Sequence, residues 1–341
     1  MGEQQRGHGR RLAGLAALLT AVALFGLSVG AASGAQAAPA SRIVAQSVSF
    51  WSSGWLSIAQ GEELLLTHNL GGAPDVYPVI ELLFEDTDGG LGINRSSYGG
   101  LEVDGAWRGA HWQALTSSTV RVIRQANDEV ADRILVNAWV PATPPDFSSP
   151  WMAIFAGQTL TFDHNLGVDP QDLTVLLWYR SGARGINHYA YGGLSAGLTT
   201  QGAFWHDLTT NSVQVTRFLA DTEVEEVHVE VVHGNAPQYD SGWRTVAQGG
   251  TLTLNHNLNW APEMLLVRGE CRDTTLLGFG INQLFAGGDE RAGLWQGSFI
   301  HNLTGTSVSA TRYGNDTACD EVRVRISKRA MQVHVPIIML P

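Results

Sequence analysis

Apolar and polar residues alternate over several short stretches of the chain. Residues 213–216, 252–255 and 322–326 each place an apolar side chain at every second position, which is the period of a strand with one buried face. Residues 79–84 and 173–178 are more densely apolar, as expected for central strands that are covered on both sides. After the first 40 residues no long stretch follows the helical period of 3.6 residues. The pattern therefore predicts an all-β protein.

The same order of sequence markers occurs three times. In each copy a tryptophan is followed by a glycine, an alternating stretch and His-Asn-Leu, and the histidine comes 13 positions after the tryptophan: Trp55 and His68, Trp151 and His164, Trp243 and His256. Later markers are Gly-Ile-Asn, a Gly-Gly pair and a closing arginine: 92–94, 185–187 and 280–282; 99–100, 192–193 and 287–288; Arg124, Arg217 and Arg312. The period of 92 to 96 residues matches a small domain rather than a solenoid unit.

Turn-forming residues separate the predicted strands within every copy. Several short strands with this spacing are typical of an antiparallel sandwich, and a small closed barrel is the alternative. We therefore predict three tandem antiparallel β-sandwich domains of about 90–100 residues. They are repeat 1 (residues 48–142), repeat 2 (148–234) and repeat 3 (240–328), followed by a C-terminal tail (329–341).

The first 37 residues have the features of an export signal. A basic n-region contains Arg6, Arg10 and Arg11. An apolar run at 12–29 and an A-x-A pattern at 35–37 follow, so we predict a signal peptide over residues 1–37. The alternative is an uncleaved segment, which would be the protein's one contact with the membrane. Either case predicts a secreted or cell-surface protein. The apolar end of the tail is either a sorting or anchoring element or a last edge strand.

Composition excludes two classes of protein. The formal net charge is −11, which disfavours a nucleic-acid partner because binding to phosphates needs a basic surface. Apolar residues make up 44% of the chain, enough to form a core and too many for a disordered protein. Zinc-protease, phosphate-loop and paired-cysteine motifs are absent from the sequence. We therefore expect no metal site and no cofactor.

Two local motifs resemble functional sites. Residues 85–89 carry oxygen ligands at the near-alternate spacing of a calcium loop, but the equivalent segment of repeat 2 contains two arginines. A solvated acidic turn is the simpler interpretation. Ser195 lies in a G-x-S-x-G match, which forms a nucleophile elbow only between a strand and a helix. Repeat 1 has Glu102 at that position, so we treat the match as coincidental and rank an enzyme last.

The histidines of the three His-Asn-Leu segments are candidate ligands or bases. They are His68, His164 and His256. Each stands at the end of an alternating stretch, with no acidic or cysteine partner at fixed spacing. We favour a structural role in which the imidazole hydrogen-bonds the turn backbone.

Amide and aromatic residues follow the Gly-Ile-Asn marker in each copy. An amide beside a flat ring suits a neutral sugar, whose hydroxyls seek oriented polar groups while its C–H faces stack on rings. The alternative is that the asparagines form turns and the aromatics belong to the core. Trp112 and Trp205 match Ile300 of repeat 3, which suits a buried apolar position. The candidate carbohydrate-binding residues are Asn94, Tyr98, Trp107, Asn187, Tyr191, His206, Asn282, Phe285, Trp295 and His301.

The order of tryptophan, glycine, strand, turn and proline, then V-x-V-x-R and a closing V-x-V strand, resembles H-type lectin domains over residues 50–328. The resemblance implies β-sandwiches of about 100 residues that trimerise and bind sugars of the N-acetylgalactosamine type. The chain is also similar to sandwich modules of secreted bacterial surface proteins. The lectin family's sugar-contacting residues have no one-to-one match here, so none is carried over.

These observations lead to an exported, non-catalytic binding protein, with glycans or a cell-surface polysaccharide as the favoured partner. Homo-oligomerisation stays open. The alternative is a structural or adhesive surface protein whose repeats act as spacers. Exposed aromatics around Asn94 and its counterparts would favour binding, whereas buried ones would favour the spacer.

Cys271 and Cys319 are the only cysteines, and both lie in repeat 3. An exported protein reaches an oxidising compartment, where such a pair forms a disulfide. The repeat alignment sets the cysteines opposite apolar residues: Phe84 and Ala131 in repeat 1, and positions near Leu177 and Val224 in repeat 2. We predict a disulfide in place of a buried apolar contact. Two free thiols are the alternative.

Overall fold

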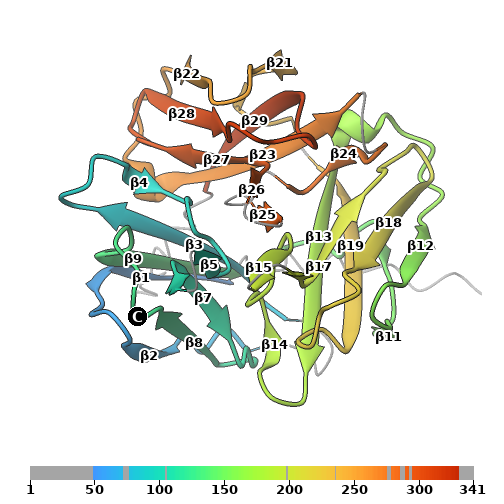
Figure 1. Ribbon diagram of the computed structural model, residues 1–341, viewed down its shortest axis with the longest axis horizontal. Helices are drawn as coiled ribbons and strands as arrows, with labels where there is room; N and C mark the ends of the chain where they lie inside the picture. Colours follow the sequence, from blue (N-terminus) through green and yellow to red (C-terminus); the bar gives the residue numbers. More distant parts are fainter. Residues whose placement is uncertain are drawn as a thin grey trace, which may run out of the picture. The chain divides into compact units, whose positions relative to one another are not determined.

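The alternating and apolar stretches of the sequence form strands in the computed structural model (Figure 1). All five stretches named above lie within strands, every strand pairing is antiparallel, and the described residues contain no α-helix. The all-β prediction is therefore confirmed.

The structure describes residues 49–71, 77–103, 106–196, 199–234, 236–274, 278–284, 289–291 and 294–329. The described parts of all three repeats belong to one compact unit. The predicted signal peptide lies outside the described residues, as does the tail after Arg329. In the described part of the chain, no helix has the length and apolar character needed to cross a membrane.

The three repeats contain matching series of strands. Those of repeat 1 are β1 (Ser49–Ser57), β2 (Glu63–Thr67), β3 (Val79–Asp86), β4 (Gly92–Asn94), β5 (Leu101–Val103), β6 (Ala106–Arg108), β7 (Ala110–Gln113), β8 (Thr119–Arg124) and β9 (Arg133–Val140). Those of repeat 2 are β10 (Phe147–Ser148), β11 (Met152–Ala153), β12 (Thr159–Asp163), β13 (Leu173–Ser181), β14 (Gly185–Asn187), β15 (Leu194–Ala196), β16 (Thr199–Gln201), β17 (Ala203–His206), β18 (Ser212–Arg217) and β19 (Glu226–His233). Those of repeat 3 are β20 (Tyr239–Asp240), β21 (Arg244–Thr245), β22 (Thr251–Asn255), β23 (Leu265–Asp273), β24 (Gly280–Asn282), β25 (Asp289–Arg291), β26 (Leu294–Gln296), β27 (Ser298–His301), β28 (Ser307–Arg312) and β29 (Glu321–Lys328). Short 3-10 helices at Pro170–Asp172 and Pro262–Met264 precede β13 and β23.

Each repeat consists of two separate sheets and a small hairpin. In repeat 1 the sheets have the orders β1-β9-β3-β4 and β2-β8-β7, and β5 pairs with β6. Repeats 2 and 3 have the same arrangement, except that two short strands replace β1. The core of repeat 1 contains buried residues of both sheets, among them Leu82, Val122 and Val136. Two sheets enclosing one core form a sandwich rather than a closed barrel. That each repeat is an independently folding domain stays a prediction.

The repeats also pair with one another through their backbones. Three equivalent hydrogen bonds join each neighbouring pair. Between repeats 1 and 2 they run from Ala114 N to Arg184 O, Leu115 N to Ile186 O and His188 N to Trp112 O. Between repeats 2 and 3 they run from Asp207 N to Phe279 O, Leu208 N to Ile281 O and Gln283 N to Trp205 O. Between repeats 3 and 1 they run from Asn302 N to Leu91 O, Leu303 N to Ile93 O and Arg95 N to Ile300 O. The three repeats therefore contact one another in closed cyclic order.

The two ends of the described chain meet in this closed arrangement. The guanidinium carbon of Arg329 lies 4.8 Å from the ring centroid of Phe50. The same guanidinium donates to the buried carboxylate of Glu81, with Nη2 and Oε2 2.9 Å apart.

Candidate functional site

The marker asparagines of the three repeats are fully buried: Asn94, Asn187 and Asn282. The side chain of each one stabilises the turn in which it lies. Each amide nitrogen donates to the carbonyl two residues earlier, at 2.8 to 3.0 Å. Each amide oxygen accepts from the backbone N–H two residues later, at 3.0 Å. These contacts correspond to the turn-forming alternative. A ligand reaches the amides only when the turns open.

The Gly-Ile-Asn marker also forms the contact between repeats. Its glycines, Gly92, Gly185 and Gly280, have φ of 54°, 61° and 52°, a region that favours glycine. A Cβ on Gly185 would lie 3.5 Å from the Cα of Ala114 in repeat 1. The isoleucine carbonyl then accepts a backbone hydrogen bond from the neighbouring repeat. The marker therefore serves assembly of the three repeats.

Three of the candidate aromatic residues pack at the interface between repeats 1 and 2. The rings of Trp107 and Tyr189 lie 5.4 Å apart, centroid to centroid. The hydroxyl of Tyr98 lies 3.3 Å from Nδ1 of His188, and the ring of His188 stacks on Tyr191 at 4.4 Å. Tyr98 is only 2% exposed. These rings join the two repeats rather than forming an exposed platform.

The remaining candidates are spread over the molecule. His206 is buried, with Nε2 2.8 Å from Oγ1 of Thr216, and Nε2 of His301 lies 2.9 Å from Oγ1 of Thr311. Burial lowers the pKa of both histidines. Phe285 and the side chain of Trp295 lie outside the described residues. The structure does not bring the described candidates together in one site, and their contact with sugar stays a prediction.

The histidines of the His-Asn-Leu segments have the structural role that we favoured. In each segment Nδ1 accepts from the leucine N–H two residues later, at 3.3 to 3.4 Å. Burial is the main cause that lowers their pKa, so the neutral form is favoured. The intervening asparagines have φ of 50° to 53°, which asparagine tolerates better than most residues.

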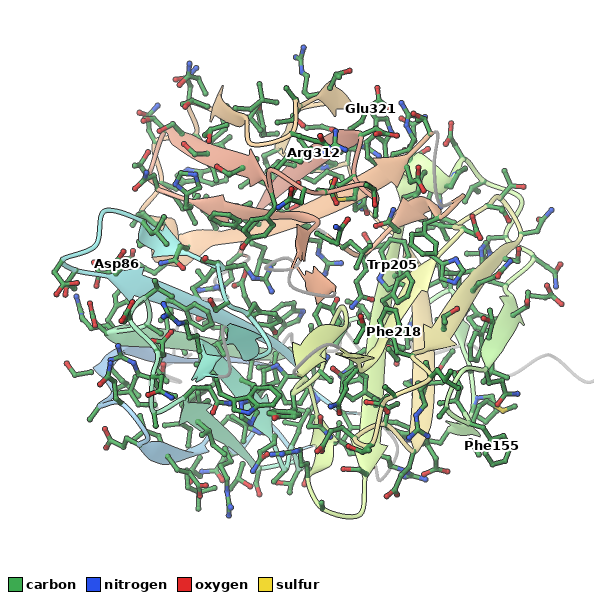
Figure 2. The ribbon with its side chains drawn as sticks, viewed as in Figure 1. Asp86, Phe155, Trp205, Phe218, Arg312 and Glu321 are labelled. Carbon is green, nitrogen blue, oxygen red and sulfur yellow. A yellow bond between two sulfur atoms is a disulfide. The ribbon has the colours of Figure 1, made fainter. Side chains whose placement is uncertain are left out.

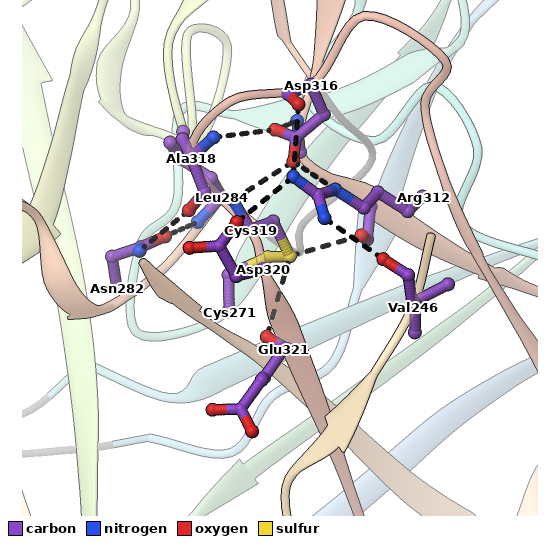
Figure 3. Close-up of a disulfide and its surroundings, with 12 residues drawn as sticks. Val246, Cys271, Asn282, Leu284, Arg312, Asp316, Ala318, Cys319, Asp320 and Glu321 are labelled. Atoms are coloured by element: carbon purple, nitrogen blue, oxygen red, sulfur yellow. Dashed lines mark hydrogen bonds and ion pairs between the residues drawn. A yellow bond between two sulfur atoms is a disulfide. The ribbon is translucent and has the colours of Figure 1, made fainter. Parts of the chain in front are cut away.

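An ion pair with a buried aspartate, which the sequence patterns did not reveal, recurs in every repeat. Its members are Arg124 and Asp128, Arg217 and Asp221, Arg312 and Asp316, with Nε and Oδ2 2.7 to 2.8 Å apart. Each arginine also donates to two backbone carbonyls, and each aspartate accepts from the backbone of a glycine and of the residue three positions later. We call each pair an arginine–aspartate node (Figure 3). The signal was an Arg-x-x-x-Asp spacing present in all three copies.

The disulfide is formed and lies beside the node of repeat 3 (Figure 3). The Cα atoms of Cys271 and Cys319 are 4.8 Å apart, and both residues are fully buried. The strand register also refines one predicted counterpart, which the sequence placed near Leu177. Strand register pairs Cys271 with Asn282 and Tyr179 with Asn187, so Tyr179, not Leu177, occupies the equivalent position in repeat 2.

The acidic cluster of Asp86, Asp88 and Asp132 forms a turn. Within the described residues this is the one group of at least three potential ligands. The carboxylate of Asp86 accepts from the backbone of Gly89 at 2.6 Å and Leu91 at 3.0 Å. Asp132 accepts from the backbone N–H of Thr87 at 2.9 Å. The turn's own donors thus occupy these oxygens.

Ser195 lies in β15, which pairs with β16 in an antiparallel hairpin. No helix follows this strand in the described part of the chain. The strand-to-helix turn that a nucleophile elbow needs is therefore missing there.

An exposed apolar pair distinguishes repeat 2. Phe155 is 72% exposed and projects from the surface (Figure 2), and Leu219 is 80% exposed. The corresponding residues are Ala59 and Ala126 in repeat 1, Ala247 and Gly314 in repeat 3. Nothing in the described residues covers this pair.

Two adjoining cavities lie where all three repeats meet. The inner cavity has a volume of about 120 Å³ and is lined by residues of the central strands β3, β13 and β23. The outer cavity has a volume of about 230 Å³ and includes the linkers between repeats. Its lining contains the exposed residues Thr143 and Gly234, so it opens to solvent. Arg268 lines both cavities.

The negative groups that line the inner cavity have protein partners, whereas one of its positive groups has none in the described part of the chain. Its carboxylates are paired, Glu81 with Arg329 and Glu270 with Arg325. Arg268, by contrast, makes no side-chain hydrogen bond or ion pair with any described residue. Burial, followed by repulsion from Arg325, lowers the pKa of Arg268.

Two further donors face the inner cavity. Gln283 is 3% exposed, and its Nε2 has no partner among the described residues although its Oε1 accepts from Trp205 N at 3.1 Å. Arg95 is held over the ring of Tyr98, with its guanidinium carbon 4.3 Å from the ring centroid. These hydrogen-bond donors are available to an acceptor on a ligand.

Comparisons of the chain with family models, curated proteins and solved structures gave no match. The function must therefore be argued from the site itself.

Proposed function

We propose that the protein is an exported, non-catalytic carbohydrate-binding protein. The observation that carries the proposal is the closed cyclic contact of three equivalent repeats. The resemblance to H-type lectin domains implies assemblies of three sandwiches, and this chain associates three within one polypeptide. The disulfide is compatible with an extracytoplasmic location.

The structural roles of the reactive groups also support a non-catalytic protein. The buried aspartates of the nodes bind backbone and arginine, and the histidines of the His-Asn-Leu segments close turns. The second candidate function is a surface spacer without a ligand. The burial of Tyr98 and the packing of Trp107 between repeats favour this alternative.

A glycan array probed with the labelled mature protein tests the proposal. We expect binding to a restricted set of glycans, because oriented polar groups select among sugars. Absence of binding to every glycan, by a chain with the circular dichroism of a folded β protein, would instead support the spacer.

A further inference from the structure

The inner cavity is built from positions that are equivalent in the three repeats but carry different side chains. Strand register makes Glu81, Leu176 and Arg268 equivalent, because they lie opposite Asn137, Glu230 and Arg325 of the neighbouring strands. All three line a cavity between the repeats. One is acidic, one apolar and one basic. Any site here is therefore single, rather than one of three copies.

The chemistry of this single site is that of an anion receptor. Arg268 is half-buried between the repeats, so its guanidinium loses part of its hydration without gaining a side-chain hydrogen bond from the described residues. The carboxylates of Glu81 and Glu270 already have their own arginines. A planar ligand carboxylate matches the fork of donors on Arg268 and can accept two hydrogen bonds from it.

The volumes indicate how large such a ligand is. The inner cavity, at about 120 Å³, is of the same order as an engineered cavity of about 150 Å³ that accepts benzene. The outer cavity adds about 230 Å³, and its lining includes the ring of Trp139 together with Pro141 and Pro237. These surfaces suit the C–H face of a sugar ring. A monosaccharide with a carboxylate thus fits the pair of cavities.

We propose that the two cavities bind one acidic monosaccharide per chain, a hexuronate whose carboxylate pairs with Arg268. The inference rests on the proposed carbohydrate-binding function and names its ligand class. The sugar enters through the outer cavity beside Thr143 and Gly234, and its carboxylate reaches Arg268, which borders both cavities.

Isothermal titration of the mature chain with glucuronate and galacturonate, against glucose and galactose, tests this site. We expect one uronate per chain and an affinity about tenfold or more above that for the neutral hexoses, because the carboxylate pairs with the half-buried guanidinium of Arg268. Arg268→Leu is expected to remove this preference. The matched control is Arg272→Leu on the same strand, whose arginine pairs with Glu321 outside both cavities.

Folding of the variant is checked separately. Leucine is the residue of repeat 2 at this position, Leu176. Arg268→Leu removes a half-buried charge that makes no side-chain hydrogen bond with the described residues, so we expect its melting temperature to stay close to that of the parent protein. Uronate should raise the melting temperature of the parent protein and of Arg272→Leu, but not that of Arg268→Leu.

Each contrary result has a distinct meaning. Equal binding of neutral hexoses, three uronates per chain, or an unchanged preference in Arg268→Leu overturns the inference and leaves carbohydrate binding standing. Inorganic phosphate that binds Arg268 while uronates do not also overturns it. No binding of any glycan, acidic or neutral, overturns both the inference and the proposed function.

Discussion

The arginine–aspartate nodes and the inner cavity are both built from equivalent positions of the three repeats, but they differ in how much those positions vary. Every node contains the same two residues, with backbone partners at equivalent positions. The cavity position contains Glu81, Leu176 and Arg268 on closely matching backbones. A buried charge that supports the sandwich must keep its partner in each copy. The cavity position has no such requirement, and a unique site can form there.

The largest expected effect comes from breaking a node. Asp316→Asn leaves Arg312 with only the partly exposed Asp320, 3.3 Å from its Nη2. It also puts an amide in place of the buried carboxylate that accepts from Arg312 and Cys319, and we expect a loss of about 3–5 kcal/mol in the free energy of unfolding. Urea denaturation followed by tryptophan fluorescence measures it. Glu321→Gln, which removes the partly exposed partner of Arg272, is the control and should cost about 1 kcal/mol or less. Equal losses in the two variants would contradict a special role for the node.

Removing the disulfide, which only repeat 3 contains, has the next largest expected effect on stability. Replacing both cysteines by serine should cost about 2–4 kcal/mol, because the crosslink restricts the unfolded chain. The variant Cys271→Tyr/Cys319→Val installs the pair found in repeat 2 and separates packing from crosslinking. Unfolding curves with and without reductant measure both effects. Parent curves that reduction leaves unchanged would show that the bond does not stabilise the fold.

Acid should weaken the interface between repeats 1 and 2 more than the others. His111 and His188 flank this interface, and burial lowers the pKa of each to about 3. Their folded pKa lies below the unfolded value of about 6.5. Their contribution to stability is therefore complete above pH 6.5 and is lost as pH falls towards 3. At pH 4.5 each histidine should account for a loss of about 2–3 kcal/mol.

Urea unfolding at pH 7 and pH 4.5 measures this loss. Repeat 3 has Gln283 where repeat 2 has His188, so His188→Gln is the matched variant. It should reduce the difference between the two pH values. The same pH dependence in parent and variant would rule out His188 as a source of the acid lability.

The smallest expected effect is a gain in stability from a substitution at the interface between repeats 1 and 2. Ala114 has φ of 50°, and the equivalent residues are Asp207 at 49° and Asn302 at 48°. Alanine is strained in this region, whereas asparagine tolerates it. Ala114→Asn should therefore raise the free energy of unfolding by about 0.5–1 kcal/mol, which thermal denaturation can detect. A lower melting temperature would show that the alanine methyl has a packing role.

The sequence predicted what depends on local periodicity or on comparison of the copies. Alternation at 252–255 marked a strand, and the matched positions of Cys271 and Cys319 indicated a buried pair. The node was missed because an arginine and an aspartate four residues apart look like an ordinary surface pair. The contact made by Gly-Ile-Asn was missed because its partner lies in another repeat.

The cavity could not be predicted for a related reason. Leu176 lies in an apolar stretch that resembles core, and Arg268 resembles any polar residue of a strand. Neither pattern tells which faces of β13 and β23 meet. The sequence suggested Tyr98 and Trp107 as sugar contacts, but these residues gather at an interface whose geometry only the tertiary structure gives.

Arg329 contacts Phe50 and Glu81, so the two ends of the described chain lie close together. The same three-repeat structure is therefore compatible with another order of the repeats along the chain. A short linker between residues 329 and 49 would connect the last strand to the first, and a new break near Thr143 would make repeat 2 the leading one. Such a circular permutant keeps all nine of the backbone hydrogen bonds between repeats given above. The contacts between repeats thus form a closed cycle, and the chain termini lie between repeats 3 and 1.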